Sequence, residues 1–238
     1  MSLTVQTHEI RSNQILNADC VQAMEQMASN SFDFILTDPP YLVNYRDRDG
    51  RRIQNDVNSD WLKPAMAQAY RVLRQDCLML CFYGWTKVDE FFAAWKGAGF
   101  QPVGHIVFRK TYCSKSRFLS YHHEQAFLLA KGRPPLPKHP VADVMDMPYS
   151  GNKLHPTQKP VAALAQLIRS FTLPSELVSC RCHKDRNGPT AVRSGRLLAG
   201  RIPRSRSRQS KVRPPLASFS LVCSAGFAKP RKGSFPRP

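Results

Sequence analysis

Four chemically distinctive residues, Asp38-Pro39-Pro40-Tyr41, directly follow an apolar stretch at residues 32–36. Residues of that type fill a buried strand, and the two prolines end it because neither has an N–H to offer a neighbouring strand. We therefore expect Asp38 and Tyr41 at the carboxyl end of a strand, the edge at which open α/β sheets bind ligands. Taken alone, the four residues fit equally well a strand followed by a rigid turn in which Asp38 caps a helix.

A carboxylate beside an aromatic ring suits chemistry on the amino group of a nucleobase. That nitrogen is a poor nucleophile because its lone pair is delocalised into the ring. Acceptors for its two N–H groups, here the Asp38 carboxylate and the Pro39 carbonyl, would expose the lone pair and stabilise the transition state. Tyr41 would stack on the base, which has to leave the duplex before its amine can be reached.

A second polar turn, His155-Pro156-Thr157-Gln158-Lys159-Pro160, precedes an apolar helical pattern. By itself it is explained as the start of a helix with Pro160 at the first position. However, the Asp38–Tyr41 run resembles motif IV of the amino-group DNA methyltransferases, and the second turn is similar to the start of motif X in their β arrangement. Both occur in the circularly permuted order of that family, so residues 14–178 resemble a β-class N6-adenine or N4-cytosine methyltransferase.

The resemblance implies a Rossmann-like α/β fold, S-adenosylmethionine as methyl donor and double-stranded DNA as substrate. Asp38, Pro39, Pro40 and Tyr41 would be the catalytic residues. The donor would be bound by Asp19, Cys20, Asp38, His155, Thr157, Gln158 and Lys159. For Asp19 there is a second interpretation, the capping of a helix at residues 21–28. The corresponding family segment is similar to Gly-Asp-Cys, whereas this chain has Ala18 in place of the glycine.

Apolar stretches alternate with amphipathic ones along the same part of the chain. Strands are expected at 14–17, 32–36, 77–83, 103–109 and 124–130, and helices at 21–28, 62–73, 88–95 and from 160. Such alternation predicts a doubly wound, mostly parallel sheet with right-handed crossovers. Residues 110–153 would then hold the insertion that recognises the target sequence.

Basic residues gather in two segments that have no secondary-structure period. The residues expected to contact DNA phosphates are Arg46, Arg48, Arg51, Arg52, Lys115 and Arg117. The loop 42–56 leaves directly from the expected catalytic edge, and we expect it to be mobile without DNA. An ordinary solvated loop explains the polarity of both segments as well.

The last sixty residues differ sharply in composition. Of the 35 Lys and Arg residues, 15 lie in 179–238, where Asp185 is the only acidic residue, so this segment supplies most of the net charge of +18. In the family, a strand with Asp-Pro-Phe and a glycine-rich turn follow motif X, and neither follows Val178.

We therefore expect a methyltransferase domain at 1–178 that is C-terminally incomplete, lacks two or three strands and binds the donor weakly. Residues 179–238 are expected to be a disordered basic tail. A rearranged coding sequence would explain the change of composition, and a tail that binds nucleic acid is the alternative.

Several function classes are disfavoured by composition. No stretch approaches the roughly twenty apolar residues of a membrane span, and residues 1–9 lack a secretion signal. Seven scattered cysteines favour a reducing cytoplasm. The resemblance to the methyltransferase family implies that this is a bacterial cytoplasm with chromosomal or plasmid DNA. Neither His122-His123 nor Cys180-x-Cys182-His183 has the spacing of a metal site, so no metal is expected.

The function expected from these features is site-specific methyl transfer to N6 of adenine in DNA. In the resembled family an Asp at the first motif position favours adenine, whereas Ser is commoner for cytosine. N4-cytosine methylation and a catalytically dead DNA-binding remnant stay open as alternatives, and RNA methylation is less favoured. A homodimer and a cognate restriction endonuclease are the expected protein partners.

Overall fold

The computed structural model describes residues 15–46, 50, 52–113, 118–150, 158–181 and 219–223. These residues form one mixed sheet of eight strands in the order β1-β8-β7-β2-β3-β5-β4-β6. The strands are β1 (Ile15–Asn17), β2 (Phe32–Thr37), β3 (Leu73–Phe82), β4 (Gln101–Lys110), β5 (His123–Lys131), β6 (Val144–Met147), β7 (Val178–Arg181) and β8 (Phe219–Cys223). Only β5 runs antiparallel to its two neighbours, so the sheet is mostly parallel, as predicted.

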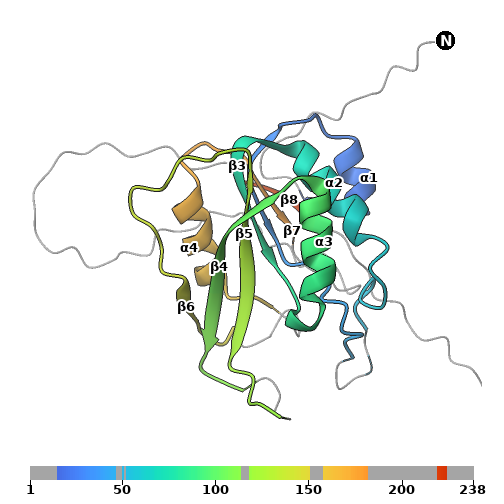
Figure 1. The fold of residues 1–238 in the computed structure, drawn as a ribbon, viewed down its shortest axis with the longest axis vertical. Helices are drawn as coiled ribbons and strands as arrows, with labels where there is room; N and C mark the ends of the chain where they lie inside the picture. Colours follow the sequence, from blue (N-terminus) through green and yellow to red (C-terminus); the bar gives the residue numbers. More distant parts are fainter. Residues whose placement is uncertain are drawn as a thin grey trace, which may run out of the picture.

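Helices cover both faces of this sheet (Figure 1). The helices are α1 (Cys20–Glu25), α2 (Leu62–Val72), α3 (Val88–Ala98) and α4 (Val161–Phe171), with a short 3-10 turn, η1 (Trp85–Lys87), before α3. In Figure 1, α4 lies on one side of the sheet and the other three helices lie on the opposite side. The predicted doubly wound, Rossmann-like α/β architecture is therefore confirmed.

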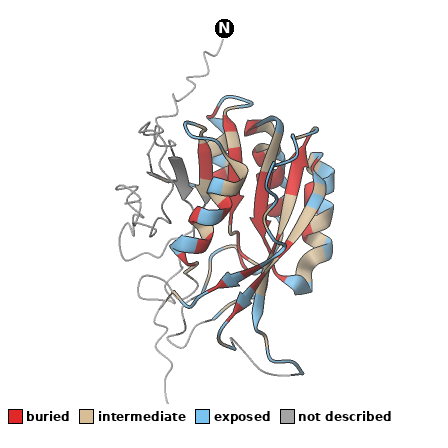
Figure 2. Ribbon diagram, turned by 90° about the vertical axis from the view of Figure 1, so that its left-hand side faces the viewer, coloured by how far each residue is buried: buried red, intermediate tan, exposed pale blue. Residues whose placement is uncertain are grey.

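Two apolar cores separate the helices from the sheet. Side chains alternate across a strand, so Ile35 of β2 packs toward α1, α2 and α3, whereas Phe34 and Leu36 pack toward α4. Phe32 joins the core of Ile35 because the register with β3 shifts between Phe32 and Phe34. Trp95 of α3 has no exposed surface and is among the largest side chains of the first core. Figure 2 shows buried residues running through the strands and exposed residues on the outer sides of the helices. The buried β2 is thus held from both faces, which fixes the position of the residues that follow it.

Several expected boundaries are wrong in detail. Residue 73 was assigned to a helix, but β3 begins at Leu73, directly after α2. The sheet also has more strands on the C-terminal side than expected, because β7 pairs with β2 and β8 pairs with both β7 and β1. Disorder is therefore wrong for 179–181 and 219–223, and the expected loss of two or three strands is wrong as well. The rest of 179–238 lies outside the described residues, and so do residues 47–49 and 51 of the loop 42–56 and residues 114–117.

Within the described ranges, no helix is long and apolar enough to cross a membrane.

Candidate active site

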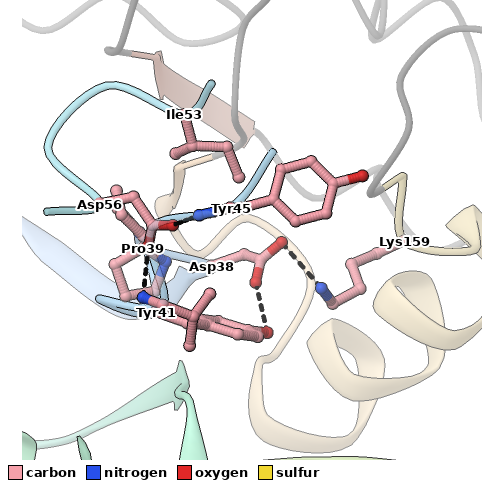
Figure 3. Close-up of a pocket in the computed structure, with 9 residues that line it drawn as sticks. Asp38, Pro39, Tyr41, Tyr45, Ile53, Asp56 and Lys159 are labelled. Atoms are coloured by element: carbon pink, nitrogen blue, oxygen red, sulfur yellow. Dashed lines mark hydrogen bonds and ion pairs between the residues drawn. The ribbon is translucent and has the colours of Figure 1, made fainter. Parts of the chain in front are cut away.

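The predicted corner lies where it was expected, immediately after the last residue of β2. Asp38 follows Thr37, and both Pro39 and Pro40 are buried. The two carboxylate oxygens of Asp38 are each in contact with another side chain (Figure 3). Oδ1 accepts a hydrogen bond of 2.8 Å from the Tyr41 hydroxyl, and Oδ2 lies 3.0 Å from Nζ of Lys159. The structure thus brings the two motifs together, since Lys159 stands at the start of α4.

Lys159 is shared between two carboxylates. Its Nζ lies 2.9 Å from Oε2 of Glu124, near the start of β5, as well as 3.0 Å from Asp38. A second lysine, Lys110 at the end of β4, lies 3.8 Å from Oε1 of Glu124. Opposite charges therefore alternate through the cluster, and the side chain of Lys159 is only 8% exposed. We call Asp38, Lys159, Glu124 and Lys110 the charge cluster.

Aromatic rings enclose the same ammonium group. Nζ of Lys159 lies 5.3 Å from the centre of the Tyr41 ring and 5.1 Å from that of Phe82. Cations are attracted to aromatic faces at such distances. The ammonium thus contacts the ring of Tyr41 that was expected to stack on a base, and the Tyr41 hydroxyl also points to Glu124, at 3.5 Å.

The electrostatics follow from burial and from this pairing. Burial opposes the charged form of Lys159, but Asp38 and Glu124 outweigh it and raise its pKa above the ordinary value. Burial likewise opposes ionisation of Glu124, yet Lys159 and Lys110 lower its pKa below 4.5. Burial and the two carboxylates raise the pKa of Tyr41 well above 10.0. At neutral pH Lys159 is therefore a cation and Glu124 an anion, with Tyr41 as a neutral donor.

Asp56 holds the chain that leaves the corner. Its side chain is buried, and its two oxygens accept the backbone N–H groups of Val43 at 3.2 Å and Tyr45 at 2.6 Å. Leu42 and Asn44 have φ values of 60° and 50°, which L residues adopt at a cost. The carboxylate of Asp56 therefore stabilises a loop conformation that the backbone alone disfavours.

Gly84, in the turn after β3, also shapes the corner. A Cβ at this position would lie 2.8 Å from the carbonyl oxygen of Tyr41 and 2.9 Å from its Cβ. One of these atoms is in the backbone of Tyr41 and the other is bonded directly to it, so neither could move aside as the end of a flexible side chain could. The turn after β3 therefore approaches Tyr41 as closely as a glycine permits.

The corner borders a cavity of about 70 Å³. Its lining is formed by Asp38, Pro39, Pro40, Tyr41, Val43, Tyr45, Ile53, Asp56 and Lys159. This volume is well below the roughly 300 Å³ at which ligand pockets begin. This cavity thus provides acceptors for an amine, but it is too small to hold a whole S-adenosylmethionine by itself.

The expected donor-binding residues are only partly brought together. Asp19 caps α1 by accepting the N–H groups of Val21 and Gln22, and Cys20 is buried in the core, so neither lines the cavity. The main chain of Gln158 accepts a hydrogen bond from Ser150. The remaining two, His155 and Thr157, lie outside the described residues.

The structure describes two of the six residues that were expected to contact DNA. Arg46 and Arg52 are both exposed and face each other in an isolated antiparallel bridge. Arg48, Arg51, Lys115 and Arg117 lie outside the described residues. Within the described ranges, no group of three or more His, Cys, Asp or Glu side chains is arranged to hold a metal ion.

Sequence reasoning missed three residues of the site. Lys110 and Glu124 lie within residues 110–153, which were expected to hold the target-recognition insertion, and Glu124 also begins the expected strand 124–130. Asp56 was taken as the end of a loop. The available signal was the presence of a charge directly beside an apolar strand, as at Glu124 before Gln125 and Ala126. Such a charge is costly to bury unless it is paired.

Comparison with known proteins agrees with this geometry. The family model described as "DNA methylase" matches residues 32–179. The protein named "Putative methylase YubD" from Escherichia coli (strain K12) is 55% identical over 166 residues, which are 70% of this chain and 73% of that protein. The chain therefore belongs to the DNA methylase family, the methyltransferases that act on the amino groups of DNA bases. Members of this family use S-adenosylmethionine as methyl donor.

Solved structures confirm the fold. The PvuII DNA methyltransferase, named as cytosine-N4-specific, has a TM-score of 0.57 at 14% identity, covering 72% of this chain and 74% of that one. The complex of M1.HpyAVI with S-adenosylmethionine has a TM-score of 0.52 at 20% identity, covering 71% and 82%. At these identities the likeness extends to the fold alone.

Proposed function

We propose that this chain transfers a methyl group from S-adenosylmethionine to N6 of adenine in double-stranded DNA at a specific site. The observation that carries the proposal is the contact between Asp38 and Lys159. An N–H donor lies 3.0 Å from Oδ2 in a largely buried position, next to an aromatic ring. The same carboxylate oxygen is therefore suited to accept an N–H of an extruded base.

The residues of this chain would divide the work in the following way. Asp38 and the Pro39 carbonyl accept the N–H groups of the amine, which favours the pyramidal nitrogen of the transition state. The buried prolines and the ring of Tyr41 exclude water and bound the site of the flat base. When bound, the donor supplies a methyl group that is electrophilic because it is attached to a sulfonium. The structure defines the orientation of the Asp38 carboxylate, and the proposal depends on that carboxylate rather than on the donor.

Binding of DNA is proposed for the arginines of the loop after the corner and for Lys115 and Arg117. Arg46 and Arg52 are exposed, which suits contact with phosphates. We further propose action in a bacterial cytoplasm on chromosomal or plasmid DNA, residues 110–153 as the target-recognition part, and a homodimer or a cognate endonuclease as partners. The methyltransferase domain, expected to end at residue 178, is proposed to include β7 and β8 as well, because both pair within the same sheet.

Two other functions have specific support. Methylation of cytosine N4 would use the same acceptors, and one structural relative is named for that base. A DNA-binding protein without catalysis is supported by the missing glycine-rich turn after Val178 and by the small cavity at Asp38. For that alternative we expect calorimetry to find no micromolar affinity for S-adenosylmethionine.

The experiment that tests the proposal is expression in a host that lacks DNA methylation, followed by single-molecule sequencing of its DNA. Modified adenines at one recurring sequence are expected with the wild type, and none with Asp38→Ala. Asp60→Ala, at an exposed aspartate of the same region, is the matched control and should retain the modification. Modified cytosines would assign N4 transfer, and unmodified DNA despite folded, abundant protein would refute catalysis.

A further inference from the structure

Both carboxylate oxygens of Asp38 already have a donor in the DNA-free protein. One oxygen accepts from the Tyr41 hydroxyl at 2.8 Å, and the other contacts the Lys159 ammonium at 3.0 Å. An incoming amine also brings N–H donors to these oxygens, so it competes with the two donors already there. Ammonium and amine thus compete for the same carboxylate, and Lys159 is the charged competitor in this largely buried position.

Of the two donors, Lys159 is the one that can withdraw and remain paired. Its Nζ already lies 2.9 Å from Oε2 of Glu124, so leaving Asp38 does not leave the ammonium without a carboxylate. A buried ion separated from all opposite charges costs several kcal/mol, which is what Glu124 avoids. The Tyr41 hydroxyl, by contrast, lies 2.8 Å from Oδ1 of Asp38 and 3.5 Å from Oε2 of Glu124, so its contact with Glu124 is the longer one.

We propose that Glu124 is a positioning residue that receives the Lys159 ammonium when an extruded base takes its place on Asp38. Resting on the function proposed above, this assigns to β5 a part in base binding that lies outside both sequence motifs. Lys159 keeps Asp38 paired until a base arrives, and Glu124 sets how readily the ammonium moves aside. Lys110, 3.8 Å from Glu124, contributes to the same balance of charge.

The charges of the cluster give this proposal a specific signature. Glu124→Gln removes the second carboxylate, so the ammonium is held by Asp38 alone and competes more strongly with the base. Adding Lys159→Met to that variant removes the competitor as well. The double variant has one acidic and one basic group left in the charge cluster, so the two kinds are again equal in number, as in the wild type. It also leaves Asp38 without the competing ammonium, so that Asp38 can accept an amine. A purely structural role predicts the opposite, with the double variant at least as impaired as the single one.

The test measures binding of deoxyadenosine 5′-monophosphate and deoxycytidine 5′-monophosphate to the full chain by ligand-detected NMR titration. No donor, catalysis or recognition sequence is needed, so failure of methyl transfer in the wild type does not affect the readout. We expect Glu124→Gln to weaken binding about tenfold, and the double variant Glu124→Gln/Lys159→Met to regain at least the wild-type affinity. When Asp38→Ala is added to each of these proteins, the differences in nucleotide affinity between them should disappear.

A matched pair of controls is offered by Lys87 and Glu90. This surface ion pair has an N–O distance of 2.7 Å, and its side chains are 41% and 29% exposed. Glu90→Gln and Glu90→Gln/Lys87→Met should both bind the nucleotides as the wild type does, and thermal unfolding should show that every variant is folded. The proposal is overturned if Glu124→Gln binds like the wild type or if the double variant binds no better than the single one. Where methylation is active, Glu124→Gln should raise KM for DNA more than it lowers kcat.

Discussion

Replacing Asp56 tests whether the loop after the corner depends on one buried carboxylate. Each oxygen of Asp56 accepts a different backbone N–H, from Val43 and from Tyr45, and the side chain is 1% exposed. Asp56→Ala leaves both N–H groups, which are partly buried, without this acceptor. Asp56→Asn keeps one oxygen but turns an NH2 group toward the other donor. The two variants therefore remove different numbers of hydrogen bonds from the same loop.

The magnitude follows from these two bonds and from an opposing cost. A hydrogen bond to a charged group contributes about 1.5–3 kcal/mol, and an unsatisfied buried donor costs about 1–3 kcal/mol. Burial, which raises the pKa of Asp56 above 3.8, shows that its ionised form is itself held at some cost. We therefore expect Asp56→Ala to lower the free energy of unfolding by about 3 kcal/mol and Asp56→Asn by about half as much.

Urea unfolding at pH 7 measures both losses, with exposed Asp60→Asn as a control that should stay within about 0.5 kcal/mol of the wild type. Burial raises the pKa of Asp56, so the folded protein binds more protons than the unfolded chain as the pH falls toward that pKa, and the stability of the wild type relative to Asp56→Asn should rise on acidification. Methyl transfer should fall in both variants, since the loop carries Tyr45 beside the cavity. Equal stabilities of Asp56→Ala and wild type would refute the role assigned to this carboxylate.

Three further predictions concern other parts of the fold. Gly84→Ala should cost about 1–3 kcal/mol and impair nucleotide binding, because the new Cβ meets the backbone of Tyr41, whereas Gly97→Ala on α3 meets nothing within 4 Å and should be neutral or stabilising in thermal melts. Lys131→Met should lower the free energy of unfolding by about 2 kcal/mol in urea titrations, since its buried ammonium donates to two carbonyls at the end of α2. Burial lowers the pKa of His105 below 6.5, so the unfolded chain binds more protons below that pH. Thermal stability should therefore fall on acidification below pH 6.5, and His105→Gln should reduce that dependence.

Local periodicity was enough to predict most of the sheet and its helices. The apolar stretch 32–36 could be assigned because both of its faces are buried, and helices such as α3 show a clear apolar stripe. The position of β8 could not be predicted, because its five residues belong to a long segment with no sustained period. Pairing with β1 and β7 is a non-local interaction, and composition alone does not report it.

Part of the candidate site was also accessible from the sequence. The contact between Asp38 and Lys159 joins two residues that the resemblance had assigned together to the donor site. The role of Lys159 was not predicted, because its second partner is distant in sequence. Asp19 illustrates the opposite case, in which a polar residue at a strand end serves as the helix cap that local reasoning had offered as an alternative.

Glu124 was missed for a topological reason. Its strand, β5, pairs antiparallel with β3, with Ala126 opposite Phe82 at the last residue of β3. Glu124 precedes Ala126 by two residues and therefore lies beyond the carboxyl end of β3, at the edge that Asp38 occupies after β2. Had β5 run parallel to β3, its first residues would lie at the opposite edge, about the length of the strand away from Lys159. The antiparallel direction of this single strand thus supplies the second carboxylate of the charge cluster, and no periodicity within residues 124–130 could reveal that direction.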